Sequence, residues 1–110
     1  MPTKGTAELV PEGNALILFL FEEATSRLLE REIVLTYEAP VVEWLIEQSD
    51  WRESLNPIRT LDGFWHEKVA KVIEEMLLNG RLHQQQSLAV ALEKSPSGKI
   101  LQYTVTDLSN

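Results

Sequence analysis

The most regular series of apolar residues lies in the second half of the chain. It begins at Leu61, and its apolar positions return every three or four residues up to Leu77, as on one side of a helix. Thr60 stands before the series as an N-cap candidate, and Gly80 follows it as a C-terminal stop. The pattern therefore predicts a helix over residues 61–79.

A shorter helix is predicted over residues 37–48. Thr36 can cap it, and Pro40 lies in its first turn, where a missing N–H costs little. Its expected buried side consists of four apolar residues: Val41, Val42, Leu45 and Ile46. Residues 49–59 separate the two helices and are expected to form a loop, because Asn-Pro within them is a turn signal.

The apolar run from Ala15 to Phe21 can be read in two ways. Taken alone it is typical of a strand, because bulky apolar residues follow one another. In a longer window, positions at helical spacing appear, with Asn14 as an N-cap: Leu18, Phe21, Thr25, Leu28 and Leu29. We expect a helix over residues 14–31, partly on the resemblance given below.

Alternation of apolar and polar residues predicts three strands. Residues 32–36 alternate as a short strand, and residues 88–92 and 101–105 alternate on either side of a turn at 95–98. A helix layer on a small sheet would bury both apolar sides. The expected class is α+β, with three helices packed on a sheet made of a short strand and a C-terminal β-hairpin.

The chain of 110 residues suits one domain. Residues 1–13 contain two prolines and two glycines without periodicity, so we expect a flexible N-terminal arm there. Residues 14–110 are expected to form the single α+β domain.

The segments RLLEREIVL and LNGRL, with the order of elements between and after them, resemble the C-terminal small (lid) domain of Clp-type AAA+ unfoldases and disaggregases. The resemblance covers roughly residues 15–106. The matching residues are Arg27, Leu28, Glu30, Arg31, Ile33, Leu35, Thr36, Val42, Trp44, Leu45, Arg59, Leu61, Val69, Ile73, Leu77, Gly80, Leu82 and Gly98. It implies a lid-like fold.

Two departures limit what this resemblance implies for ATP chemistry. The family presents a sensor-2 arginine from a Gly-Ala-Arg turn, whereas this chain has Asn56-Pro57-Ile58 before Arg59. The sequence also has no G-x-x-x-x-G-K-[ST] phosphate loop and no acidic Walker-B strand. Arg59 remains a sensor-2-like candidate that would reach a nucleotide only in a partner subunit, and we expect no ATP hydrolysis by this chain.

Composition narrows the classes of partner. The net charge of −7 opposes binding to nucleic acid and to anionic membrane surfaces, and the run Ala15–Phe21 is too short to span a bilayer. The absence of cysteine removes disulfides, thiolate metal sites and cysteine nucleophiles. We expect a cytoplasmic chain without cofactors.

No group of residues in the sequence indicates a reaction. His66 with Asp62 could begin a metal site, but position 70, where a second helical ligand would stand, is Ala. We therefore predict no metal site and no enzyme. The alternative is a ligand-binding protein or small enzyme with a pocket near Arg59, His66 and Tyr103, which requires these three side chains to converge.

In a helix, the apolar residues of the run Ala15–Phe21 would extend around more of the circumference than one buried stripe covers. Some of its residues should remain available to another molecule, unless the N-terminal arm covers them. Trp51 in the following loop either folds back onto the core or stands out as a second anchor for a partner. The predicted partner interface consists of Leu16, Ile17, Phe19, Leu20 and Trp51. In the family that the chain resembles, lids pack against neighbouring subunits. The expected function is thus a non-enzymatic protein-interaction module, acting by self-association or by docking on a larger, possibly AAA+/Clp, assembly.

Overall fold

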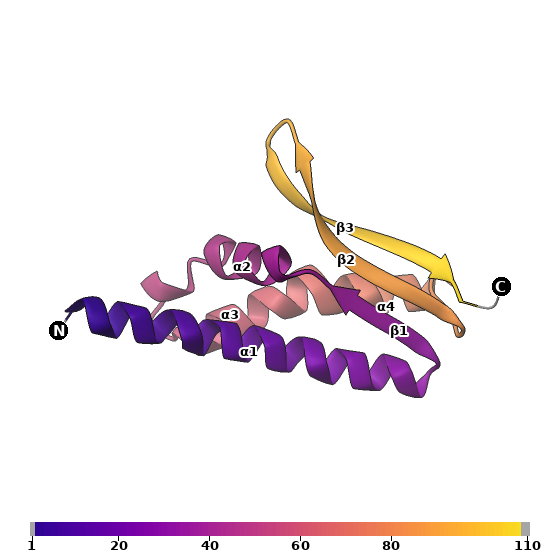
Figure 1. Cartoon of the computed structure of the whole chain (residues 1–110), viewed down its shortest axis with the longest axis horizontal. Coiled ribbons are helices and arrows are strands. Elements are labelled where there is room, and N and C mark those ends of the chain that lie inside the picture. Colours follow the sequence, from indigo (N-terminus) through magenta and orange to yellow (C-terminus); the bar gives the residue numbers. More distant parts are fainter. Residues whose placement is uncertain (1, 109–110) are drawn as a thin grey trace.

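A layer of helices lies under a three-stranded sheet (Figure 1). The computed structural model describes the backbone of residues 2–108 and the side chains of residues 13–51 and 53–108. The elements are α1 (Pro2–Glu30), β1 (Ile33–Tyr37), α2 (Ala39–Gln48), the 3₁₀ turn η1 (Trp51–Glu53), α3 (Pro57–Trp65), the π-helical turn η2 (His66–Ala70), α4 (Lys71–Leu78), β2 (Gln86–Ser95) and β3 (Gly98–Asp107). The predicted α+β class, with a short strand and a C-terminal hairpin, is confirmed.

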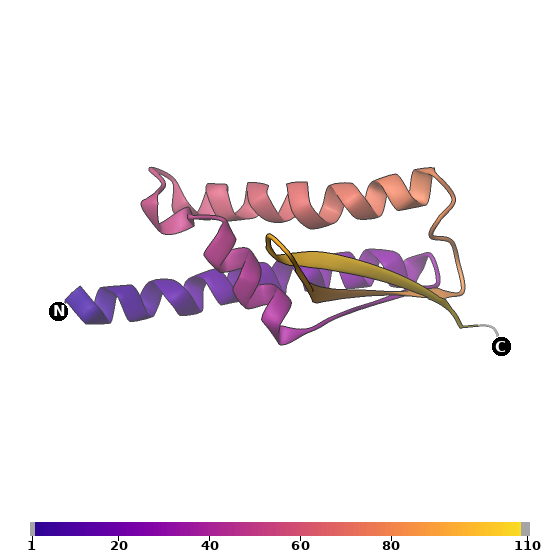
Figure 2. The same cartoon turned by 90° about the horizontal axis from the view of Figure 1, so that it is seen from above.

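The sheet is mixed and has the order β1-β2-β3. β1 and β2 are parallel, with Leu35 beside Leu88, and the crossover between them contains every helix after α1. β2 and β3 form an antiparallel hairpin in which Val90 lies beside Tyr103. As a result α1 and the α3–α4 segment run in the same direction, with α2 crossing between them (Figure 2).

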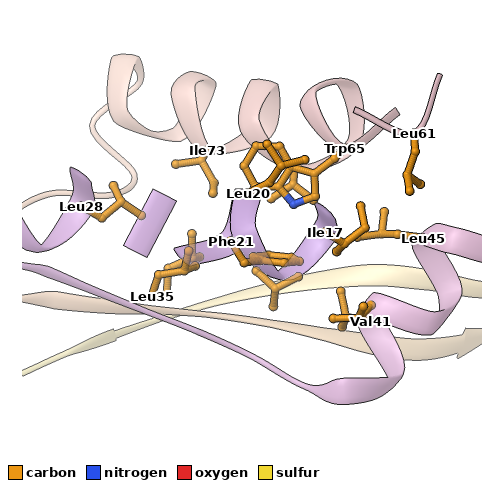
Figure 3. Packing of buried hydrophobic residues seen from close by; sticks show 14 of the residues in the cluster. Ile17, Leu20, Phe21, Leu28, Leu35, Val41, Leu45, Leu61, Trp65 and Ile73 are labelled. Atoms are coloured by element: carbon orange, nitrogen blue, oxygen red, sulfur yellow. The ribbon is translucent and has the colours of Figure 1, made fainter. Parts of the chain in front are cut away.

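The core lies between the sheet and the helices. Ile33 and Leu35 of β1 point inward and are buried, whereas Val34 between them is exposed, as the predicted alternation requires. Residues from α1, α2, α3 and β1 meet at its centre (Figure 3). Labelled members of this cluster are Ile17, Leu20, Phe21, Leu28, Leu35, Val41, Leu45, Leu61, Trp65 and Ile73.

An aromatic stack connects the sheet, α1 and α3. The ring of Phe21 lies parallel to that of Tyr37, with centroids 4.1 Å apart, and meets Trp65 edge to face at 5.6 Å. Trp65 Nε1 is buried and has no hydrogen-bond partner among the described residues. Figure 3 shows this nitrogen on the edge of the indole that faces Phe21.

The structure confirms a helix over Ala15–Phe21, but this helix begins earlier in the sequence than predicted. α1 begins at Pro2, so Asn14 lies inside the helix and its prediction as N-cap is wrong. Met1, the first residue of the predicted arm, lies outside the described residues. Gly13, the last residue of the predicted arm, is buried in α1 against the ring of Trp51. Packing at this position outweighs the low helix propensity of glycine.

Two further N-caps differ from the prediction. Thr36 pairs with Ala89 as part of β1, and α2 begins later, after Glu38. The third helix begins earlier than predicted, at Pro57, because the Asn56 side chain accepts a hydrogen bond from the Arg59 N–H at 3.5 Å. Asn as N-cap with Pro at the first helical position is a known start signal.

The predicted long helix is continuous but changes its winding in the middle. In η2 the Lys71 N–H donates to the His66 carbonyl, five residues back instead of four. The Tyr103 hydroxyl donates a hydrogen bond to the Lys68 carbonyl within this turn. Gly80 follows α4 with φ of 75°, which confirms the predicted stop.

Candidate functional site

A groove lies between α1 and the α3–α4 segment. Its volume is about 570 Å³, and its lining consists of helical residues together with Arg31, which directly follows α1. They are Leu16, Phe19, Leu20, Glu23, Ala24, Arg27, Leu28, Arg31, Asp62, Trp65, His66, Ala70, Ile73, Glu74 and Leu77. On each helix these positions recur at steps of three and four, so the groove follows both helices for several turns.

The groove is open because the two helices approach closely at one end only. α1 packs against α3, whereas its contacts with α4 are few. In the middle of the groove the two walls carry alanines, Ala24 from α1 and Ala70 from η2, and both are half-buried. A methyl group fills little of the space that a larger side chain would occupy. The small residues therefore contribute to the hollow between the walls.

The floor of the groove is apolar. Leu20, Leu28, Trp65 and Ile73 are each at most 6% exposed and belong to the core cluster. Phe19 stands on the α1 wall with 55% of its surface exposed. A buried apolar floor beside an exposed aromatic ring is typical of sites that bind an apolar side chain of another molecule.

Charged residues on the walls are distributed unevenly along the groove. Arg27 and Arg31 lie one turn apart near the end of α1, and both are exposed. Neither forms an ion pair within the part of the chain that the structure describes. Toward the other end, His66 Nδ1 lies 3.6 Å from a carboxylate oxygen of Asp62 and 2.9 Å from its carbonyl oxygen. The end of the groove beside Leu77 thus carries two arginines on one wall and Glu74 on the other.

Of the five residues predicted to form the partner interface, some are exposed in the structure and others are buried. Leu16 and Phe19 line the groove and keep exposed surface, as predicted for an interface. Ile17 is 0% exposed and Leu20 is 6% exposed, because both project between the helices into the core. Their prediction as exposed contacts is wrong, although Leu20 still forms part of the floor.

Trp51 is also not an exposed anchor. Its indole is 1% exposed and covers the α1 backbone at Gly13. The turn η1 folds it back onto the core, because the backbone before it, at Asp50, takes a left-handed conformation with φ of 52°. Of the two alternatives that the sequence left open for Trp51, the structure has the ring folded back onto the core and not the partner anchor.

The three side chains of the predicted ligand pocket do not converge. His66 lines the groove, whereas the Tyr103 hydroxyl binds the Lys68 carbonyl. Residues 66 and 68 point to roughly opposite sides of a helix, since each residue turns it by about 100°. Arg59 is exposed near the start of α3, and the groove lining does not include it. None of the pockets found among the described residues is lined by all three side chains.

Among the side chains of residues 13–51 and 53–108, no cluster of three or more His, Cys, Asp or Glu residues could hold a metal ion. Arg59 forms no ion pair within the described segments, and its exposed position leaves the sensor-2-like role a prediction.

Sequence reasoning missed the second wall of the groove. Trp65, Ile73 and Leu77 were expected only as buried positions of a long helix, because periodicity shows which side is apolar but not which helix faces it. The signal that was available is the excess of apolar residues in α1, which indicated surface beyond one stripe. It located Leu16 and Phe19 but not their neighbours on α4.

No protein-family model matches the chain, and no curated protein shows significant similarity to it. Among the helices of residues 2–108, none has the length and apolar character needed to cross a membrane.

Proposed function

We propose that this chain is a non-enzymatic protein-interaction module that binds a helix of a partner protein in the groove between α1 and α3–α4. The observation that carries the proposal is the combination of an apolar floor, the exposed ring of Phe19 and two arginines on one wall that form no ion pair with any described side chain. Amphipathic helices bind such grooves through apolar residues spaced at three and four positions.

The dimensions favour a helix as the occupant. The lining on the α1 wall extends from Leu16 to Arg31, which corresponds to roughly 22 Å at 1.5 Å per residue. A helix of about four turns has the same length. It would place its apolar stripe on the floor, with one large side chain against Phe19.

Charge sets the direction in which the partner helix would lie. Arg27 and Arg31 favour acidic side chains at the end of the groove near Leu77. Glu23 lies closer to Phe19 and favours a basic side chain there. The proposed partner is therefore an amphipathic helix with acidic residues toward one end and a basic residue toward the other.

The resemblance to Clp-type lid domains makes a subunit of an AAA+ assembly the first partner to test. A lid-like module without a phosphate loop can dock on such an assembly and cannot itself hydrolyse ATP. A chain without cysteine is compatible with the reducing cytoplasm, which is the compartment we propose for it.

The test uses a substitution that fills part of the groove without changing the charge of its walls. The substitution Ala24→Leu places a larger side chain between the walls, and Ala15→Leu adds the same atoms at an exposed position of α1 that is not part of the lining. Wild type and both variants are used to capture proteins from an extract of the native cell. A purified helical segment of any captured protein is then titrated against each variant by calorimetry.

The proposal predicts that the segment binds wild type and Ala15→Leu equally and binds Ala24→Leu at least about tenfold more weakly. Equal binding to all three proteins, or a captured segment that is extended rather than helical, would overturn the groove as the docking site.

A further inference from the structure

β3 is a long strand with one unpaired edge. It forms ten successive pairs with β2 and, among the strands of residues 2–108, none with another strand, since the sheet ends there. The strand contains no proline, and its register shows no bulge. Native proteins usually protect an edge of this length with bulges, prolines or several charges. The opposite edge strand, β1, has only five residues.

The backbone groups that β3 presents at this edge belong to its odd-numbered residues. The Leu108 N–H donates to the Gln85 carbonyl, so Leu108 points its backbone groups toward the β2 side. Backbone groups alternate in direction along an antiparallel strand. Five residues therefore direct their N–H and C=O groups away from β2: Lys99, Leu101, Tyr103, Val105 and Asp107.

We propose that β3 pairs in antiparallel fashion with β3 of a second copy of this chain, with the two-fold axis at Tyr103. In this register Lys99 of each copy lies opposite Asp107 of the other. Lys99 and Asp107 are the only charged residues of β3, and they have opposite signs at equal distances from Tyr103. Opposite charges across a strand pair stabilise it, and like charges destabilise it.

The remaining residues are also compatible with this register. Leu101 comes to lie opposite Val105 of the second copy on the helix-facing side of the sheet. On the open side, Ile100 comes opposite Thr106 and Gln102 opposite Thr104, so no like charges meet. All five outward-pointing residues face outward-pointing residues, which allows about ten hydrogen bonds between the copies. A dimer with this two-fold axis uses the same surface twice.

The position of Lys99 within one copy supports the proposal. It lies directly opposite Lys94 on β2, an unfavourable pair of like charges. Glu43 and Glu47 of α2 line a hollow beside it, but neither forms an ion pair with it in the described structure. Asp107 accepts a hydrogen bond from Gln86 Nε2 at 2.8 Å on one carboxylate oxygen, and its other oxygen can accept from Lys99 of a second copy.

This surface is separate from the groove between α1 and α3–α4, because no residue of the sheet lines that groove. The inference therefore does not depend on the proposed function. Ala24→Leu is expected to leave self-association unchanged, so failure of one proposal is distinguishable from failure of the other.

The test is a charge swap measured by sedimentation over micromolar to millimolar concentrations. Wild type is expected to show a reversible monomer–dimer equilibrium. Lys99→Asp and Asp107→Lys each place like charges opposite one another and should weaken dimerisation about tenfold. The double variant restores opposite charges in both pairs and should return the dissociation constant to within about threefold of wild type.

Amide hydrogen exchange gives an independent readout of the same dimer. Amides of Leu101, Tyr103 and Val105 should become protected only as concentration rises, whereas amides of Gln102 and Thr104, which bond to β2, should be protected throughout and report an intact hairpin. A monomer at every concentration, or a double variant as weak as the single variants, would overturn the proposal.

Discussion

The indole of Trp51 lies directly on the α1 backbone at Gly13, so that a Cβ atom at position 13 would be 2.9 Å from Trp51 Cζ2. This contact is shorter than van der Waals contact allows, and the ring is 1% exposed. It connects the turn η1 to the first helix and explains why a glycine is accommodated inside α1.

The first prediction concerns this contact. Gly13→Ala gains about 1 kcal/mol of helix propensity but overpacks a buried ring, which costs about 1–3 kcal/mol. We expect a net loss of up to about 2 kcal/mol in the free energy of unfolding, measured with urea. In a Trp51→Leu background the same substitution should become stabilising, and stabilisation in both backgrounds would contradict the contact.

Gly63 is a second glycine inside a helix, and it serves as the control because no side chain packs against it. It is exposed in α3, and no atom lies within 4 Å of the position that a Cβ would take. Gly63→Ala should therefore raise the free energy of unfolding by about 0.5–1 kcal/mol. A loss of stability in the same urea titration would show that α3 has another conformation at this residue.

Much of the fold was predictable from periodicity, because each element has one apolar side. Alternation predicted β1 and the hairpin, and spacing of three and four predicted the helices. The start of α1 was not predictable, because prolines and glycines in residues 2–13 oppose a helix locally. The contact between Gly13 and Trp51, which lie far apart in the sequence, is absent from any local window.

The candidate site was predictable in part for the same reason. The width of the apolar surface on α1 indicated a site at Leu16 and Phe19, but periodicity does not reveal which helix forms the opposite wall. For Trp51 the sequence left two alternatives open, a ring folded back onto the core or an exposed anchor, because the outcome depends on a left-handed Asp50 in a loop.

Tyr103 leads to a prediction about alkaline pH. Burial raises the pKa of Tyr103 to about 12, above the ordinary value of 10.0. The folded protein thus holds this proton more tightly than the unfolded chain does, and the resulting stability is complete below pH 10 and is lost as the pH rises toward about 12. Two pKa units correspond to about 2.7 kcal/mol, and the partial exposure of the ring makes the observed effect smaller.

The measurement uses Tyr37→Phe as the reference protein, because burial and Glu22 also raise the pKa of Tyr37. Between pH 10 and pH 12 this reference should lose more stability to urea than the double variant that also carries Tyr103→Phe. Equal pH dependence of the two proteins would show that Tyr103 does not titrate with folding.

The two arginines of the groove yield a prediction that separates stability from binding. Because Arg31 forms no ion pair in the described residues, Arg31→Glu should change the free energy of unfolding by no more than about 0.5 kcal/mol. The same substitution should weaken binding of the partner helix about tenfold, more so at low salt. Arg81→Glu is the control, since Arg81 is exposed but does not line the groove.

Photo-crosslinking in the native cell tests the central claim, docking of a partner in the groove, most directly. Phe19 is 55% exposed and lines the groove, whereas its neighbour Leu18 is 42% exposed and does not. A photoreactive phenylalanine derivative placed at position 19 should form a covalent adduct with a second protein, and the same derivative at position 18 should not. No adduct from position 19, or equal adducts from both positions, would contradict the account.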